Sequence, residues 1–216
     1  MSRRFLALGA GCALLVAMAA CDSGLDVNPA DFDQLPWLAD LDYEQVVPAA
    51  SFDYWEFRYV LEVGDQEPDS VIGAGGSLSR AELDTTIIAV LDTLTAAPGF
   101  GIECLPGLCY KYVVSVAGPN IEIWNTPAEL EAFLGTIGSW QEAAMLVNAY
   151  DYYWDTEDRA AGGIREVSDG YEALVLELVS TCVPVQVNRS LVRVTRAGVV
   201  TEISTEEWSK VENGCI

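Results

Sequence analysis

Histidine is absent from all 216 residues of the sequence. It is the only side chain whose unperturbed pKa lies close to neutrality, so its absence excludes His-based Ser or Cys triads, His-ligated zinc sites and imidazole acid–base chemistry. Any catalysis would have to rely on carboxylates, tyrosine, lysine or a bound metal. We expect no cofactor.

Basic residues are scarce: 11 Lys and Arg stand against 33 Asp and Glu. A surface of this charge repels phosphate backbones, so nucleic acid is not an expected partner. The 51% hydrophobic content is nevertheless too high for a disordered acidic chain, so we expect a folded protein. The glycines near Val71–Leu78 lack the third glycine of a dinucleotide-binding fingerprint, and we expect a loop there and no nucleotide.

The first twenty residues have the pattern of an export signal. Arg3 and Arg4 precede sixteen small or apolar residues, a length typical of a signal peptide and too short to span a bilayer comfortably. Residues 15–21, Leu-Val-Ala-Met-Ala-Ala-Cys, resemble the lipobox of bacterial lipoproteins, with Met18 in place of the usual leucine. The resemblance covers the signal region alone. It implies cleavage after Ala20 and a lipid on Cys21, whereas the alternative is an ordinary secretory peptide cut at the same place.

A lipidated Cys21 would make the protein an exported lipoprotein of a bacterial envelope, held to a membrane by its acyl chains. The acidic charge offers no attraction to anionic lipid, so the lipid would provide the attachment. Asp22 resembles the signal that retains enteric lipoproteins in the inner membrane. That rule does not hold in all bacteria, so the inner and the outer membrane both stay open.

Charge is distributed unevenly after Cys21. Residues 21–157 carry 24 acids and only three bases, whereas residues 158–216 carry nine acids and six bases. Residues 21–50 are acidic and interrupted by three prolines, and we interpret them as a tether with one docked turn. Residues 51–216 then form a single α+β domain.

The expected elements of that domain follow from periodicity and capping. Alternation over residues 52–63 predicts a strand with one buried face and with Glu56 and Arg58 on the opposite face, followed by a loop over 64–77. Capping boxes predict helices near 80–96, 127–134 and 140–151. Further strands are expected at 110–117 and 121–124, and hairpin turns predict a C-terminal meander over 164–204. Together these patterns indicate an antiparallel sheet with about three helices packed on one face.

Four cysteines remain beyond Cys21. An even number in an exported protein favours disulfides, and the Pro-Gly turn between Cys104 and Cys109 brings these two close. We therefore expect a second bridge between Cys182 and Cys215. A tetrathiolate metal site is the less favoured alternative, because the spacing lacks two close pairs.

The most unusual segment is 150–158, where aromatic and acidic residues alternate. It could stack a sugar and hold it through carboxylates, or present oxygens to Ca²⁺, although it is not an EF-hand. The alternative is a helix end whose rings enter the core while the acids face water. The candidate ligand-binding residues are Asp151, Tyr152, Tyr153, Trp154, Asp155, Glu157 and Asp158.

Two classes of function stay open. We prefer a non-catalytic binding or accessory module whose partner is an envelope glycan, Ca²⁺ or another protein. The alternative is a carboxylate-based hydrolase of the glycosidase type, with Asp151, Asp155 or Glu56 as candidates and roughly 5–9 Å between two carboxyl groups. The arginines Arg189, Arg193 and Arg196 could bind an anion, but salt bridges to the many acids are favoured.

Overall fold

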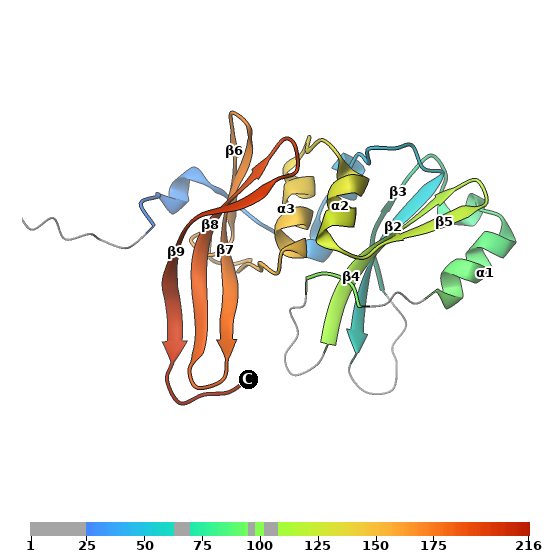
Figure 1. Cartoon of the computed structure of the whole chain (residues 1–216). Coiled ribbons are helices and arrows are strands. Elements are labelled where there is room, and N and C mark those ends of the chain that lie inside the picture. Colours follow the sequence, from blue (N-terminus) through green and yellow to red (C-terminus); the bar gives the residue numbers. More distant parts are fainter. Residues whose placement is uncertain (1–24, 63–69, 95–97, 102–107) are drawn as a thin grey trace, which may run out of the picture.

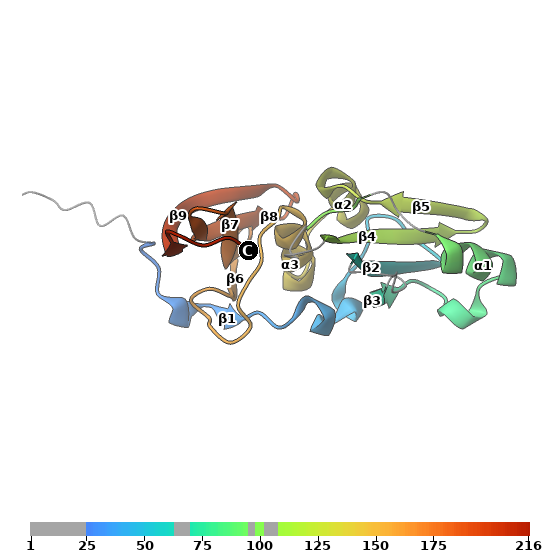
Figure 2. The ribbon, with the colours of Figure 1, turned by 90° about the horizontal axis from the view of Figure 1, so that it is seen from below.

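The computed structural model describes residues 25–62, 70–94, 98–101 and 108–216. It contains two antiparallel sheets, of four and five strands, with helices α2 (Pro127–Leu134) and α3 (Trp140–Ala149) between them (Figures 1 and 2). Helix α1 (Thr85–Thr93) lies at the far end, beyond the four-stranded sheet. The α+β class is therefore confirmed, with two sheets in place of one and helices on both faces of the four-stranded sheet.

The four-stranded sheet has the order β3-β2-β4-β5. Side chains of β2 alternate between two apolar clusters: Trp55 and Phe57 pack toward α2 and α3, whereas Tyr54 and Val60 pack toward α1. Both faces of the sheet are thus buried. The strands are β2 (Tyr54–Glu62), β3 (Ser70–Gly75), β4 (Leu108–Ala117) and β5 (Asn120–Trp124).

Two expectations for this region are wrong. Glu56 and Arg58 do not face water but are buried, because α1 covers the face of β2 on which they lie. The expected loop over 64–77 contains strand β3 in its described part, which pairs with β2 along its length.

All three capping boxes form, but the first one begins a different element. Ser79 and Glu82 cap a single 3-10 turn, Arg80–Glu82, and α1 begins only at Thr85 with Asp84 as its N-cap. The helix expected over 80–96 is therefore shorter at its start. The boxes of α2 and α3 stand where the sequence placed them, at Thr126 with Glu129 and at Ser139 with Glu142.

The five-stranded sheet has the order β1-β6-β7-β8-β9. Strands β6 to β9 form the expected C-terminal meander, in which each strand pairs with the next. Gly170 and Gly198 stand at hairpin turns with φ of 140° and 83°, a region that favours glycine. The strands are β1 (Asp33–Gln34), β6 (Gly163–Val167), β7 (Gly170–Thr181), β8 (Val185–Thr195) and β9 (Val200–Val211).

The expected tether over residues 21–50 is not found in its described part. From Leu25 onward this segment packs along both sheets: β1 pairs with β6, and Phe32, Leu35, Tyr43 and Val46 are buried. The buried apolar residues of this segment are spaced widely and reach the cores on both sheets, so the segment is packed from Leu25 onward. The prolines shape turns in a packed segment and do not mark a free linker.

The cysteines near the C-terminus behave as expected. Cys182 and Cys215 form a disulfide that joins the end of β7 to the segment after β9. Cys109 is disulfide-bonded and fully buried, while Cys104, its expected partner, lies outside the described residues.

Candidate functional site

The aromatic and acidic segment 150–158 follows α3 and crosses to the five-stranded sheet. The rings of Tyr152, Tyr153 and Trp154 are half-buried, and Tyr152 and Trp154 pack on the main core. The carboxylates lie in water, at Asp151, Asp155, Glu157 and Asp158. The segment therefore forms a rim in which the rings are partly covered and the acids are wet.

Hydrogen bonds hold the aromatic part of this rim in place. Tyr153 pairs with Leu176 of β7 through two backbone hydrogen bonds, and the Trp154 indole N–H donates to the Pro36 carbonyl at 2.7 Å. The residue after Pro36 is Trp37, which is 67% exposed. The fold thus brings the strongly exposed Trp37 close to Trp154, although the two residues are far apart in the sequence.

The carboxylates of the rim have local structural partners. Asp155 Oδ1 accepts hydrogen bonds from the backbone N–H groups of Glu157 and Asp158, and Asp158 Oδ1 accepts from that of Ala160. Among the described residues, no group of three or more Asp, Glu, His or Cys side chains is arranged to hold a metal ion. These acids shape a turn, and the described residues offer no preassembled Ca²⁺ site.

A second group of acids adjoins the rim and was missed by sequence reasoning. Tyr152 Oη donates to Glu202 Oε2 at 3.4 Å, and burial together with Glu202 and Glu177 raises the Tyr152 pKa to about 12. Burial, and then the charges of Glu202 and Asp151, also raise the pKa of the Glu177 carboxyl. These acids come from β7, β9 and the loop after α3, so only the sheet pairing brings them together.

The raised pKa of Glu177 gives a stability prediction. Glu177 binds its proton more tightly in the folded than in the unfolded state, so its stabilising contribution is present at low pH and is lost as the pH rises through the folded pKa. At pH 7.5, Glu177→Gln should increase the free energy of unfolding by about 0.5 kcal/mol, and the gain should shrink toward pH 4. Urea unfolding at the two pH values measures this. Glu122→Gln, on the exposed side of β5, is the control, and an equal gain there would contradict the assignment.

A groove of about 1010 Å³ runs between the segment before β2 and the helices α2 and α3. Two carboxylates lie along it, Glu131 and Glu142. Glu142 is buried and accepts hydrogen bonds from the backbone N–H groups of Val47, Gly138 and Ser139, while Glu131 accepts one from the Tyr150 hydroxyl. Because Glu142 is engaged in holding the loop against the helix, this groove gives no support to a two-carboxylate hydrolase.

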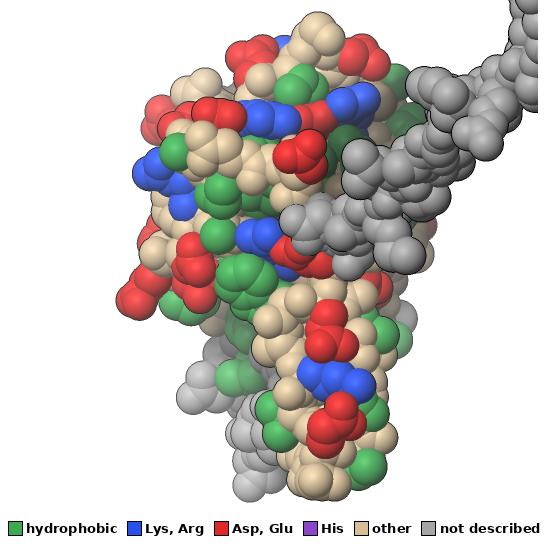
Figure 3. Space-filling view, turned by 90° about the vertical axis from the view of Figure 1, so that its left-hand side faces the viewer, with side chains coloured by type: hydrophobic (Ala, Val, Ile, Leu, Met, Phe, Trp, Pro, Cys, Tyr) green, Lys and Arg blue, Asp and Glu red, His purple; other side chains and the backbone are tan. Residues whose placement is uncertain are grey.

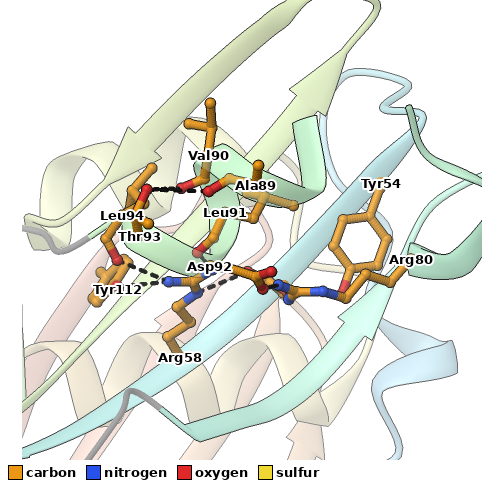
Figure 4. A network of polar contacts seen from close by, with 11 residues as sticks. Tyr54, Arg58, Arg80, Ala89, Val90, Leu91, Asp92, Thr93, Leu94 and Tyr112 are labelled. Carbon is orange, nitrogen blue, oxygen red and sulfur yellow. Dashed lines mark hydrogen bonds and ion pairs between the residues drawn. The ribbon is translucent and has the colours of Figure 1, made fainter. Parts of the chain in front are cut away.

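The third hydrolase candidate, Glu56, belongs to a buried ionic network with Arg58, Arg80 and Tyr54. Figure 4 shows these three partners of Glu56 close to α1. The Glu56 carboxylate accepts hydrogen bonds from Arg58, from Arg80 at 2.6 Å and from the Tyr54 hydroxyl at 2.8 Å. Arg58 also donates to the carbonyls of Leu91 and Leu94 at the C-terminal end of α1. Glu56 is 0% exposed. A substrate could not reach it, and its position indicates that it fixes α1 to the sheet.

The arginines of the meander are engaged in ion pairs, as favoured from the sequence. Arg193 and Arg165 both pair with Glu172, and their hydrogen bonds lower the Glu172 pKa despite its burial. Arg189 pairs with Glu206, and Arg196 pairs with Glu166. These arginines are therefore paired with acids of the protein itself, and the contacts do not support an anion site.

Comparison with protein families, curated proteins and solved structures finds no match to this chain. Within the described residues, no helix is both long and apolar enough to cross a membrane.

Proposed function

We propose that the protein is a lipoprotein of a bacterial envelope, anchored by acyl chains on Cys21, whose folded part is a non-catalytic binding or accessory module. The lipobox-like residues before Cys21 carry this proposal. Two features support it: packing of the chain begins by Leu25, just after the expected anchor, and a disulfide joins Cys182 to Cys215, as is common in oxidising compartments.

The anchor is tested by replacing the modified cysteine. In a bacterial host that processes lipoproteins, Cys21→Ser should shift the protein from the membrane fraction to the soluble or retained-precursor fraction. Cys12→Ser removes the other cysteine of the signal region and should leave the distribution unchanged. Mass spectrometry of the N-terminal peptide should find Cys21 acylated. An unmodified Cys21, or a Cys21→Ser protein that still partitions as the parent does after signal cleavage, would overturn the proposal.

The contact surface of the module, on this proposal, is the rim 150–158, and its ligand is an envelope glycan. Half-buried rings next to wet carboxylates suit stacking on a sugar face combined with hydrogen bonds to hydroxyl groups. The Trp154 indole donates to the Pro36 carbonyl, and the next residue is the exposed Trp37. Two tryptophans therefore lie near each other at the rim. A glycan is favoured over Ca²⁺ because Asp155 and Asp158 already bond backbone N–H groups.

Tryptophan fluorescence tests this surface. Titration with soluble peptidoglycan fragments and envelope polysaccharides should quench the fluorescence of the unaltered protein, and Trp154→Phe should remove most of the change. Trp124→Phe replaces another half-buried indole, on β5, and should keep the response. If the glycan still quenches the fluorescence of Trp154→Phe, the glycan binds elsewhere on the protein. A melting temperature that rises with Ca²⁺ and is insensitive to glycan would assign the rim to the cation instead.

A further inference from the structure

We propose that the outer face of the five-stranded sheet, the face turned away from α2 and α3, lies against the phospholipid headgroups of the membrane that holds Cys21. This inference depends on the proposed lipid anchor and adds to it the orientation of the whole protein. The face is built from alternate residues of β6, β7 and β8, together with Glu206 and Trp208 of β9, and Leu25 and Phe32 of the N-terminal segment cover part of it.

The length of chain before Leu25 is the first argument. The Leu25 backbone N–H donates to Glu206 at 2.9 Å, and its side chain is buried with Phe32, Leu174 and Leu191 on this outer face. Three residues separate Leu25 from Cys21, and these four residue steps span at most about 14 Å. Since packed layers are about 10 Å apart, the four-stranded sheet lies roughly 20 Å deeper than the outer face. A chain this short holds the outer face, and not the far sheet, near the lipid.

Charge gives the second argument. Arg165, Arg189 and Arg193 lie on the outer face, because their cross-strand partners Glu172 and Glu206 share it. The three arginines are paired with these two glutamates, while the exposed acids Asp26, Asp31 and Asp33 lie on the neighbouring N-terminal segment, so charges of both signs stand close together here. Figure 3 shows this side of the molecule, where Lys and Arg side chains stand beside Asp and Glu side chains. Because the bases of this face partly compensate its acids, anionic headgroups would repel this face less than the far end of the molecule.

The opposite end of the molecule is strongly acidic at its surface. Its three bases are drawn inward: Arg58 and Lys111 are buried, and Arg80 joins Glu56 to Asp92. Among the described residues of this half, the exposed acids therefore outnumber the exposed bases, of which the partly exposed Arg80 is already paired with Glu56 and Asp92. An anionic membrane would repel this end, so electrostatics and the short chain favour the same orientation.

Trp208 supplies the third argument. It is 40% exposed, and the Arg189 guanidinium lies over its ring, 4.9 Å from the centroid. Tryptophan and arginine with apolar bodies and polar ends are the side chains favoured at the boundary between lipid and water. The pair stands on the outer face next to Glu206, which binds both Arg189 and the Leu25 backbone.

Quenching by brominated lipid tests the orientation in the full lipidated protein. The protein is reconstituted in vesicles of phosphatidylcholine and phosphatidylglycerol, with and without a phospholipid brominated near the headgroup end of its chains. We expect the brominated lipid to quench part of the tryptophan fluorescence, and Trp208→Tyr to remove most of that quenching. Trp37→Tyr is the matched control: Trp37 is more exposed than Trp208 but precedes the 3-10 turn Leu38–Asp40, which contacts β3 of the four-stranded sheet, so its loss should leave the quenching unchanged.

The outcomes separate this inference from the proposed function. An unacylated Cys21 in the same sample overturns both. An acylated Cys21 with quenching that is absent, or that persists in Trp208→Tyr, overturns the orientation alone. Quenching removed by Trp37→Tyr places another surface at the membrane. A dimer in detergent that Trp208→Tyr dissociates assigns the outer face to a second copy of the chain, and it too overturns the proposal.

Discussion

Glu56→Gln is expected to lower the free energy of unfolding by about 3–5 kcal/mol, the cost of breaking a buried ion pair from one side. The carboxylate of Glu56 compensates two guanidinium groups, and Arg58 is itself 96% buried, with 4% of its surface exposed. Without this negative charge, the bonds of Arg58 to the Leu91 and Leu94 carbonyls and to the Tyr112 hydroxyl would remain, but these neutral groups do not compensate its positive charge. Urea unfolding monitored by fluorescence measures the change.

Two further variants separate the ion pair from general disruption. Asp92→Asn removes the exposed partner of Arg80 and should cost less than about 1 kcal/mol, as surface ion pairs do. The double variant Glu56→Gln with Arg58→Met removes both charges, and its destabilisation should be smaller than the sum of the two single changes. A Glu56→Gln protein that unfolds within about 0.5 kcal/mol of the parent would show that the network is not a source of stability.

This network also explains why one part of the fold escaped prediction. Alternation along β2 was interpreted correctly as a strand, but alternation identifies two faces and does not say what covers each of them. Glu56 and Arg58 carry charges, which usually indicates a water-facing side. The charges are accommodated here because they compensate each other beneath α1, a contact made by residues more than 30 positions apart. Period-two patterns cannot detect such a contact.

Elements whose boundaries depend on residues close together in the chain were predicted well. Capping boxes identified the starts of α2 and α3, and hairpin turns identified the meander, in which Gly170 and Gly198 stand at turns. The number of sheets could not be obtained in this way, because no local pattern tells whether β1 joins β6 or β2. The same limit applies to the candidate site: the rim 150–158 stands out in the sequence, whereas its neighbours Glu177, Glu202 and Trp37 are distant in the chain.

The segment before β2 shows how composition can mislead. Acids and prolines over residues 21–50 resemble a linker, yet Phe32, Leu35 and Tyr43 are buried among both sheets. A few large apolar side chains are enough to fix a segment when each has a place to pack, since one buried side chain of this kind contributes roughly 1.5–3 kcal/mol. For the proposed lipoprotein, the consequence is a folded part held close to its anchor.

Cys215→Ser is expected to lower the free energy of unfolding by about 3–4 kcal/mol, because the disulfide with Cys182 closes a loop of 32 intervening residues. The bridge joins the end of β7 to the chain beyond β9, across a β8–β9 hairpin that forms one side of the five-stranded sheet. Both cysteines are exposed, so a reducing agent should reproduce the effect in the unaltered protein. Denaturant unfolding with and without dithiothreitol measures both changes.

The double variant Cys182→Ser with Cys215→Ser tests whether the bond itself is responsible. Each single variant removes the same bond, so the double variant should be no less stable than either single one beyond about 0.5 kcal/mol. If the stability losses of the two single variants add in the double variant, the effect belongs to the two thiol positions separately, and loop closure is not its origin.

The shorter loop expected for Cys104 and Cys109 should contribute only about 2 kcal/mol in the same chain-entropy treatment. Protein made without its signal peptide stays in a reducing cytoplasm and should lack the Cys182–Cys215 bond, as the Cys215→Ser variant does. Amide hydrogen exchange in β9, from Val200 to Val211, should therefore be faster in both proteins than in the oxidised one.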